Sequence, residues 1–485
     1  PDGGENLNDL NRRAGEFLYD IESKYTGKNI LIVTHQGVIS SMHMVAEGGD
    51  RASFIEAKEN KTYTFGFADF RKLDFVPLPH NEDYEVDLHK PYIDEVVLID
   101  KEGKEMKRVK EVMDVWFDSV SMPFSQEHYS FDKESIDYPA DFISEAIDQT
   151  RGWFYTLHAI GVIMGKGKAY KNVICLGHIL DSEGKKMSKS VGNIVDPNLM
   201  MDKYGVDTLR FWMYSVNQPG DSKNFDERTV DEIVKKIWNP ILNIISFYEM
   251  YKTENIDFIE SKNVLDKWII SRLGELIGQG SKSLEGYDAF SAARLIRDFV
   301  NDFSTWYIRR SRERFKGSNE EDKKNALATT RFVLLELSKY LAPFAPFFAE
   351  FVYQKLKKEA DVESVHLCGW PEVSNIENEV LKKMEEVRKI VSLALEKRNT
   401  AGIKVRQPLS ELKIKNKELR DLVDYIVLIK EEVNVKDVFF DENLKEELEL
   451  NTEITEELRR EGMERDIIRF IQDLRKEANL NPSES

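Results

Sequence analysis

A short basic loop, Lys-Lys-Met-Ser-Lys-Ser at residues 185–190, constrains this chain more than any other feature of its sequence. The loop follows Gly184 and a short apolar run at 173–176, Val-Ile-Cys-Leu, which is typical of a buried strand. Lysine is a compact charge on a flexible stem, and ammonium groups aimed at a triphosphate stabilise the negative charge that builds up during phosphoryl chemistry. The loop therefore predicts a triphosphate site, with a solvated basic loop as the alternative.

Further motifs lie on both sides of this loop. They are Asp-Leu-His-Lys-Pro-Tyr-Ile-Asp at 87–94, Asp-Val-Trp-Phe-Asp-Ser at 114–119, Asp-Gln-Thr-Arg-Gly-Trp-Phe at 148–154 and Asp-Lys-Tyr-Gly-Val-Asp at 202–207. In this order the motifs resemble the class I aminoacyl-tRNA synthetases, and within that class the isoleucyl enzymes. The resemblance is almost continuous from Asp87 to Asp226. It implies an α/β, Rossmann-like catalytic half-domain.

Four parts are expected along the 485 residues, because a chain of this length exceeds one hydrophobic core. Residues 1–70 resemble part of an α/β histidine phosphatase domain, and residues 71–228 the C-terminal half of the class I catalytic domain. Residues 229–374 are expected to form an all-α anticodon-binding bundle, and residues 375–485 a truncated, small α+β module. Because the chain opens at Pro1 and stops soon after a helical run, we interpret it as a fragment of a longer polypeptide.

Periodicity predicts the elements of these parts. A helix is expected from about residue 7 to 25, and a helical region from 229 to about 360. Within it, apolar residues at 299, 303, 306 and 307 recur at the spacing of one helix face. Prolines at 343 and 346 should separate two helices. A charged helix at 375–399, strands at 412–415 and 435–440, and a final helix from about 453 to 478 complete the prediction.

The resemblance assigns amino-acid activation to a few positions. In the basic loop it implies catalytic roles for Lys186, Ser188 and Lys189, with Met187 beside ATP. The residues that it implies at the aminoacyl-adenylate are Glu145, Asp148, Gln149, Gly177 and His178. The spacing of positions 145, 148 and 149 predicts that they share one helix face. A solvated acidic face is the alternative for these three.

Two tryptophans, Trp116 and Trp153, match the walls of the family's amino-acid pocket. Flat, rigid indoles suit the recognition of an aliphatic shape, because they add apolar contact without losing many rotamers. A purely structural core role is the alternative for each. The family usually has glycine where this chain has Val120, which brings a β-branched side chain near the predicted pocket.

An aromatic and basic string at 306–315, Trp-Tyr-Ile-Arg-Arg-Ser-Arg-Glu-Arg-Phe, predicts a helix that contacts RNA. Aromatic rings stack on bases, and guanidinium groups bind phosphates. The tRNA-binding residues expected from this string are Trp306, Arg309, Arg310, Arg312 and Arg314. It resembles the isoleucine branch of the family, as do the strings at 402–409 and 458–462. The alternative is an ordinary ion pair between Arg309 and Glu313 on a solvated face.

The N-terminal segment carries a different pattern. A β-branched run at 29–34 ends in Thr-His-Gln-Gly, which places His35 at the C-terminal edge of a predicted strand, where open α/β sheets bind ligands. The segment resembles the C-terminal half of the histidine phosphatases, and His35 would match their second pocket histidine. The superfamily's Arg-His-Gly motif is absent from this sequence, so the segment alone is not expected to be catalytic. A structural histidine at a strand end is the alternative.

Composition narrows the setting. Two cysteines, Cys175 and Cys368, are too few for a disulfide framework or a four-cysteine zinc site, so no zinc is expected and a reducing cytoplasm is favoured. No apolar run approaches the length of a membrane span. The net charge of −18 argues against generalised binding of nucleic acid but permits a local basic site.

The resemblance implies an isoleucine–tRNA ligase that acts as a monomer on isoleucine, ATP with Mg²⁺, and tRNA(Ile). The family's His-Ile-Gly-His-type ATP motif is not in this chain, so the chain alone is expected to be inactive. Valyl- and leucyl-tRNA synthetases are near alternatives, although the strings at 306–310 and 404–409 favour the isoleucyl enzyme. Alternatives of other classes are a phosphohydrolase with a helical appendage, centred on His35, and a non-catalytic tRNA-binding protein.

Overall fold

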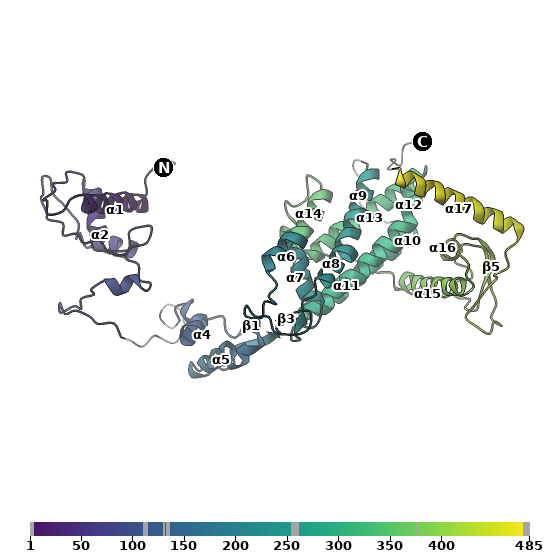
Figure 1. The fold of residues 1–485 in the computed structure, drawn as a ribbon, viewed down its shortest axis with the longest axis horizontal. Coiled ribbons are helices and arrows are strands. Elements are labelled where there is room, and N and C mark those ends of the chain that lie inside the picture. Colours follow the sequence, from purple (N-terminus) through teal and green to yellow (C-terminus); the bar gives the residue numbers. More distant parts are fainter. Residues whose placement is uncertain are drawn as a thin grey trace. The chain divides into compact units, whose positions relative to one another are not determined.

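The computed structural model describes residues 4–109, 115–129, 131, 136–253, 261–373 and 376–478 (Figure 1). The chain divides into two compact units, residues 1–118 and 119–485, which are described separately below. Helix α4, Val115–Ser125, crosses the division between them. Among the described helices, none combines the length and the apolar character that crossing a membrane would require.

The first unit contains short helices. They are α1 (Leu7–Lys24), α2 (Gln36–Ala46), α3 (Arg51–Glu59) and the 3₁₀ turn η1 (Tyr92–Glu95). The predicted helix from residue 7 is confirmed, and Asn6 and Asp9 form a capping box at its start. Helices α1 and α2 pack through a small core of Ala14, Leu18, Met42 and Val45.

The strand predicted at 29–34 is not formed. No strand occurs among the described residues of the first unit, so this run has no neighbouring backbone to pair with. Two of its side chains, Leu31 and Val33, are 72% and 87% exposed. A β-branched run becomes a strand only where a second strand accepts its hydrogen bonds, which is why local propensity was misleading here.

The second unit opens with a parallel β-α-β arrangement, which confirms the predicted α/β half-domain. Strand β1 (Ala140–Ala146) pairs in parallel with β2 (Tyr170–Leu176), and the 3₁₀ turn η2 (Ile147–Arg151) and helix α5 (Trp153–Ile163) connect them. A core of Val120, Ile143, Phe154, Leu157 and Ala169 lies between these elements. A second parallel pair follows, β3 (Ile179–Leu180) with β4 (Lys223–Asn224). Helices α6 (Pro197–Tyr204) and α7 (Val206–Ser215) lie between these two strands in the chain.

A helical bundle follows, as predicted. Its elements are α8 (Glu227–Ile233), the π-helical η3 (Val234–Trp238), α9 (Asn239–Tyr251), α10 (Val264–Glu285), α11 (Ala289–Asn301), the π-helical η4 (Asp302–Ile308), α12 (Arg309–Lys316), α13 (Glu320–Leu341), α14 (Pro346–Leu356) and the short η5 (Val365–Leu367). Helix α10 packs on both α11 and α13 (Figure 1). The apolar face predicted at 299, 303, 306 and 307 is buried. The two prolines do separate α13 from α14, with Pro346 in the first turn of α14.

The C-terminal part is a small α+β module. It comprises α15 (Asn378–Thr400), β5 (Leu409–Ile414), α16 (Val423–Val433), β6 (Val435–Phe440), β7 (Leu448–Leu450) and α17 (Glu456–Glu477). The strand order is β6-β5-β7, with β5 parallel to β6 and antiparallel to β7. Both predicted strands and the predicted last helix are confirmed. Helix α15 contacts α10 of the bundle and α16 of the module, and so connects the two (Figure 1).

Candidate active site and RNA-facing surfaces

The carboxyl ends of β1 and β2 form one edge of the parallel pair. Glu145 is in register with Cys175, and Ala146 with Leu176. Because parallel strands end on the same side of a sheet, the residues that follow them emerge at one edge, where α/β folds bind ligands. Asp148 follows β1 there, and Gly177 and His178 follow β2. The structure thus places the two predicted groups of adenylate-site residues at a common edge.

The prediction that positions 145, 148 and 149 share one helix face is wrong. Glu145 is in strand β1, whereas Asp148 and Gln149 are in the 3₁₀ turn η2. Pairing with β2 holds residue 145 in extended backbone, and the chain turns only after Ala146. Gln149 also has a local role, since its Oε1 accepts a hydrogen bond of 2.9 Å from the backbone N–H of Trp153 at the start of α5.

Gly177 has a steric reason to be glycine. Its N–H donates to the carbonyl of Pro219 at 2.8 Å, and a Cβ built on it would lie 2.3 Å from the carbonyl oxygen of Asp221. The backbone of the 219–222 loop therefore passes directly against residue 177. His178 is exposed, and its carbonyl accepts from the N–H of Lys223 at 2.8 Å. These contacts hold the chain in place just before the basic loop.

The basic loop begins as a tight turn around Asp181. The carboxylate Oδ1 of Asp181 accepts from the N–H groups of Glu183 at 3.0 Å and Lys185 at 2.8 Å. The N–H of Asp181 donates to the carbonyl of Lys185 at 2.9 Å. Gly184 supplies the positive φ of +80° that the turn requires. This turn brings Lys186 into a bridge with Leu180.

Asn193 closes the loop from its other end. Its Nδ2 donates to Asp181 Oδ2 at 2.7 Å and to the carbonyl of Lys186 at 3.3 Å. Its Oδ1 accepts from the N–H of Ser188 at 2.9 Å. Neither Asp181 nor Asn193 was predicted as a site residue. The available signal was the placement of an Asp and an Asn, both turn-forming residues, on either side of the lysines.

The loop presents two ammonium groups that no acidic side chain of the described residues neutralises. Lys185 forms an ion pair with Glu183 at 2.6 Å. Lys186 and Lys189 are exposed and have no ion pair within the part of the chain that the structure describes. Hydrogen bonds from Asn193 and from the Lys185 N–H lower the pKa of Asp181, so the turn carries its negative charge at neutral pH. Met187 and Ser188 are half-buried, and the Ser188 and Ser190 hydroxyls lie 3.1 Å apart.

The two predicted pocket tryptophans differ in setting. Trp153 is half-buried against the core of the β-α-β arrangement, with its ring centroid 5.9 Å from that of Phe154. Trp116 is 44% exposed near the start of α4, in the first unit, so its pairing with Trp153 stays a prediction. The unusual Val120 is 1% exposed and belongs to the same core as Phe154. Its extra methyl groups therefore fill that core.

Arg314, in the predicted RNA helix, is committed to an internal network. It donates to both carboxylate oxygens of Asp266 at 2.8 and 2.7 Å and pairs with Asp322. Asp266 is fully buried and also accepts from the hydroxyls of Tyr307 at 2.7 Å and Ser261 at 2.6 Å. Burial opposes the charge on Arg314, yet the bonds to Asp266 and Asp322 hold its pKa above the ordinary value. Arg314 therefore stabilises the bundle.

Other residues of this string are also partly used by the fold. Trp306 is 7% exposed, in the core, so its ring does not offer a stacking surface for a base. Arg309 bonds Glu432 at 2.7 Å, and Arg310 pairs with both Glu431 and Glu432 of α16. Arg309 thus pairs with Glu432 and not, as the alternative reading had it, with Glu313.

Arg312 differs from the other arginines of this string in its lack of an acidic partner among the described residues. It lines an open groove of about 880 Å³ together with Lys262, Arg309, Arg310 and acidic residues of α16. Acidic as well as basic side chains line this groove, and of its cations Arg312 and Lys262 have no ion pair within the described residues. The groove should therefore attract RNA phosphates less strongly than the sequence predicted.

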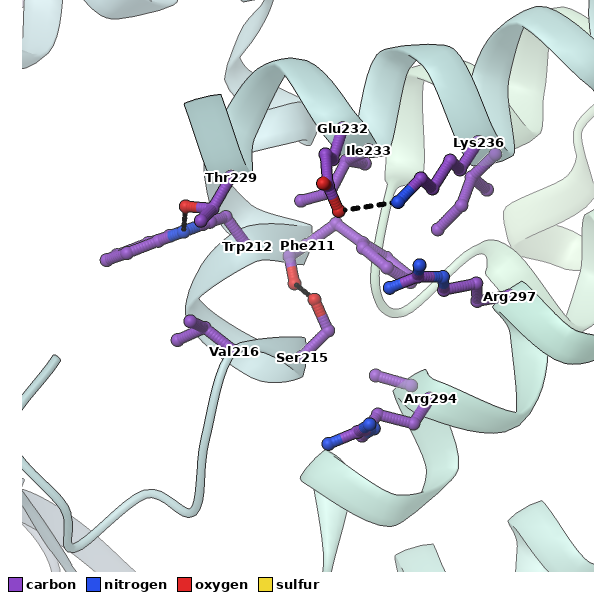
Figure 2. Close-up of a pocket in the computed structure, with 12 residues that line it drawn as sticks. Phe211, Trp212, Ser215, Val216, Thr229, Glu232, Ile233, Lys236, Arg294 and Arg297 are labelled. Carbon is purple, nitrogen blue, oxygen red and sulfur yellow. Dashed lines mark hydrogen bonds and ion pairs between the residues drawn. The ribbon is translucent and has the colours of Figure 1, made fainter. Parts of the chain in front are cut away.

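A smaller pocket of about 190 Å³ lies between α7, α8, η3 and α11 (Figure 2). Phe211, Ile233 and Ile237 line it and are buried. Arg294 and Arg297 also line it, both exposed and without an ion pair in the described part of the chain. Figure 2 shows both guanidinium groups near the pocket, with the Lys236–Glu232 ion pair of 2.8 Å beside them. Neither arginine belongs to a basic string, so no sequence pattern marks these two positions.

His35 precedes α2 as its N-cap residue. Its side chain is exposed and makes no capping hydrogen bond. The strand that was expected to carry it is absent, so the predicted position at a sheet edge is not formed in the described first unit.

Comparison with known proteins agrees with this architecture. Residues 68–226 match the model for tRNA synthetases class I (I, L, M and V), and residues 266–414 match the anticodon-binding domain of tRNA ligase. Residues 1–63 match the histidine phosphatase superfamily, branch 1. The first two matches cover the β-α-β arrangement with the basic loop, and then most of the helical bundle with the start of the C-terminal module.

The similar curated proteins are isoleucine–tRNA ligases. That of Clostridium tetani is 43% identical over 384 residues, which is 76% of this chain and 37% of that protein. The Clostridium novyi protein is 45% identical over 74% of this chain and 36% of its own length. The Dehalococcoides mccartyi protein is 40% identical over 82% of this chain and 43% of its own length. The chain therefore spans less than half the length of these relatives.

Two domain matches in the order of one enzyme class, together with these identities, lead to one conclusion. Residues 68–226 carry a class I tRNA synthetase domain, and residues 266–414 carry the anticodon-binding domain of a tRNA ligase.

Proposed function

We propose that this chain carries the pyrophosphate-binding loop, part of the adenylate site and the tRNA-binding bundle of an isoleucine–tRNA ligase. The observation that supports this most directly is the braced loop that begins at Asp181, three residues after His178 at the sheet edge. It carries Lys186 and Lys189, which have no ion pair within the described residues. In this proposal residues 71–228 contribute to activation, residues 229–374 bind tRNA, and residues 375–485 brace the bundle.

In the first step the isoleucine carboxylate would attack the α-phosphate of ATP, and pyrophosphate would leave. Such a reaction depends mainly on positioning and on stabilising the charge that accumulates on the phosphate oxygens. Lys186 and Lys189 would supply that positive charge from a backbone already held in place, so little reorganisation is needed. Lys185 would contribute less, because Glu183 already neutralises it.

At the sheet edge, Glu145 and Asp148 would face the ammonium and ribose groups of the adenylate. Both carboxylates are exposed. Mg²⁺ would arrive with ATP, because this ion is commonly held by substrate phosphates with few protein ligands. Within the described residues, no three acidic, histidine or cysteine side chains converge as a metal site. The second step would transfer isoleucine from the adenylate to the tRNA.

Contact with tRNA would rest on the cations that the fold does not use. These are Arg312 and Lys262 in the groove, and Arg294 and Arg297 at the pocket in Figure 2. Each would bind backbone phosphate, which positions an RNA without reading its sequence. Isoleucine is favoured over valine or leucine as the substrate because the similar curated proteins are isoleucine–tRNA ligases.

Exchange of labelled pyrophosphate into ATP, measured on the natural full-length protein, tests this proposal. We expect exchange that depends on isoleucine and is weaker with valine or leucine at equal concentration. Exchange driven best by valine or leucine would reassign the substrate. No exchange with any of the three amino acids would refute the proposal.

A further inference from the structure

We propose that Asp181 and Asn193 are positioning residues, which act as a clamp that holds the two lysines of the basic loop ready for the departing pyrophosphate. The inference rests on the proposed function and adds to it two residues that touch neither lysine side chain. The clamp acts on the backbone of the loop. Its effect on the reaction is therefore indirect, through the places from which the Lys186 and Lys189 side chains extend.

The clamp is a closed set of hydrogen bonds between side chain and backbone. The carboxylate of Asp181 accepts from the N–H groups of Glu183 and Lys185 through Oδ1, and from Asn193 Nδ2 through Oδ2 at 2.7 Å. Asn193 then contacts the loop on both sides of Met187, at the Lys186 carbonyl and at the Ser188 N–H. The backbone is thereby held at Lys185, at Lys186 and at Ser188, directly before Lys189.

The chemistry of the two side chains explains why this pair suits the task. An asparagine amide has one donor group and one acceptor group, so a single side chain can satisfy an N–H and a carbonyl of the same loop. A carboxylate has lone pairs on both oxygens and can accept three bonds at once, and it needs a donor opposite it. Asp181 and Asn193 are therefore complementary in a defined direction, with the amide donating to the carboxylate.

Rigid placement is valuable because the lysine side chains are long and flexible. Ordering such side chains on binding costs conformational entropy, and a mobile loop backbone would add to that cost. The clamp removes the backbone part of this cost before ATP arrives. Since the lysines would act most strongly as charge builds up, loosening the clamp should lower kcat more than it raises the KM for ATP.

Exchanging the two side chains tests the clamp. In Asn193→Asp two carboxylates face each other, and in Asp181→Asn two amide groups present donors to each other. The double variant Asp181→Asn/Asn193→Asp restores one donor and one acceptor in the reverse direction, but it turns the 3.3 Å bond to the Lys186 carbonyl into a contact between two acceptor oxygens. We expect each single variant to lower kcat for isoleucine-dependent pyrophosphate exchange, by up to about 100-fold as for a misplacement of about 1 Å. The double variant should recover most of the loss.

Hydrogen exchange at the Ser188 and Lys185 amides provides a readout that does not depend on activity. Both N–H groups donate within the clamp, so their protection should fall in the single variants and return in the double variant. Glu183→Gln is the matched control. It removes a carboxylate from the same loop but keeps the Glu183 backbone N–H in the clamp, so protection of the Lys185 and Ser188 amides should not change.

The outcomes separate the two proposals. A wild-type protein without amino-acid-dependent exchange would refute the proposed function, and with it the role of the clamp in that reaction. An active wild type whose Asn193→Asp variant keeps its kcat while losing amide protection would refute the clamp alone. A double variant that regains protection but not turnover would also refute it, because the loop would then be held without effect. Thermal melts of all variants exclude global unfolding as the cause.

Discussion

At the scale of single residues, identical side chains have opposite roles. Arg312 and Arg314 are two positions apart on α12, yet Arg314 is bonded to the buried Asp266 while Arg312 is exposed. Lys185 and Lys189 differ in the same way, since Glu183 neutralises only the first. The sequence string shows the charges but not their partners. Within each pair the residue type is the same and the surrounding partners differ, so mutating both members shows the effect of the partners alone.

Lys189→Ala should lower isoleucine-dependent pyrophosphate exchange in the natural full-length protein by about 100- to 1000-fold. Removing one preorganised donor to a developing negative charge typically has an effect of that size. Lys185→Ala, in the same loop, should change exchange little, because that ammonium is already paired with Glu183. Equal losses in the two variants would show that general loop charge matters, and not the position of Lys189.

Arg314→Ala should lower the free energy of unfolding by about 3–5 kcal/mol, because it leaves the carboxylate of Asp266 buried without its guanidinium partner. Arg312→Ala should change it by less than about 0.5 kcal/mol, as an exposed substitution without a partner. Urea unfolding followed by tryptophan fluorescence would measure both. A small effect at Arg314 would mean that the network around Asp266 reorganises at little cost.

At the scale of elements, the strings at 402–409 and 458–462, which resemble the isoleucine branch, connect neighbouring helices and strands through hydrogen bonds. The loop at 402–409 is held by Arg398 of α15, which is 1% exposed and donates to the carbonyls of Lys404, Gln407 and Asn434. Gln407 in turn donates to the carbonyl of Leu458 in α17 at 2.7 Å. One buried guanidinium thus ties α15 to the loop before β5 and to the turn before β6.

Arg398→Met should destabilise the C-terminal module by about 1–3 kcal/mol for each carbonyl that is left without a donor and away from water. Methionine keeps much of the apolar stem, so lost packing contributes little. Lys397→Met is the control on the same helix, because Lys397 is part of an exposed ion pair with Glu446. Hydrogen exchange of the backbone at 402–409 would locate the effect. Unchanged protection at 402–409 in Arg398→Met would contradict the role of Arg398 in holding this loop.

At the scale of the whole molecule, a net charge of −18 would restrict the proposed RNA binding to small local surfaces. The structure indicates that much of the predicted arginine string is neutralised by acidic residues of α16 and α10. The pocket in Figure 2, by contrast, has two arginines without ion pairs in the described part of the chain. Affinity for tRNA is therefore expected to depend on Arg294 and Arg297 as well as on Arg312.

Arg294→Ala/Arg297→Ala should weaken tRNA binding and reduce the slope of log K against log salt by about two units, close to one for each phosphate contact. Lys389→Ala/Lys397→Ala removes the same charge, but both lysines already pair with glutamates, so its slope should stay near that of the wild type. Filter binding at several salt concentrations decides between them. Equal slopes in both double variants would place the RNA elsewhere.

The sequence by itself indicated the class I synthetase resemblance and most helices. These depend on local information, namely motif strings, turn residues and the periodicity of apolar positions such as Phe299 and Phe303. The sequence also located the basic loop and the residues at the end of β2, because a motif fixes the spacing of its residues and of those next to it along the chain. Where local preference and tertiary pairing agreed, as in β5 and β6, the predictions were confirmed.

Only the tertiary structure decided which residues are available for chemistry. Arg314 finds Asp266 48 positions away, and Arg309 finds Glu432 123 positions away, and no local pattern encodes such partners. Glu145 is in a strand because β2 pairs with β1. The run at 29–34 is not a strand, because no described residue of its unit pairs with it as a second strand. The free energy of a hydrogen bond or ion pair belongs to both partners, so it is defined only once the fold has brought them into contact.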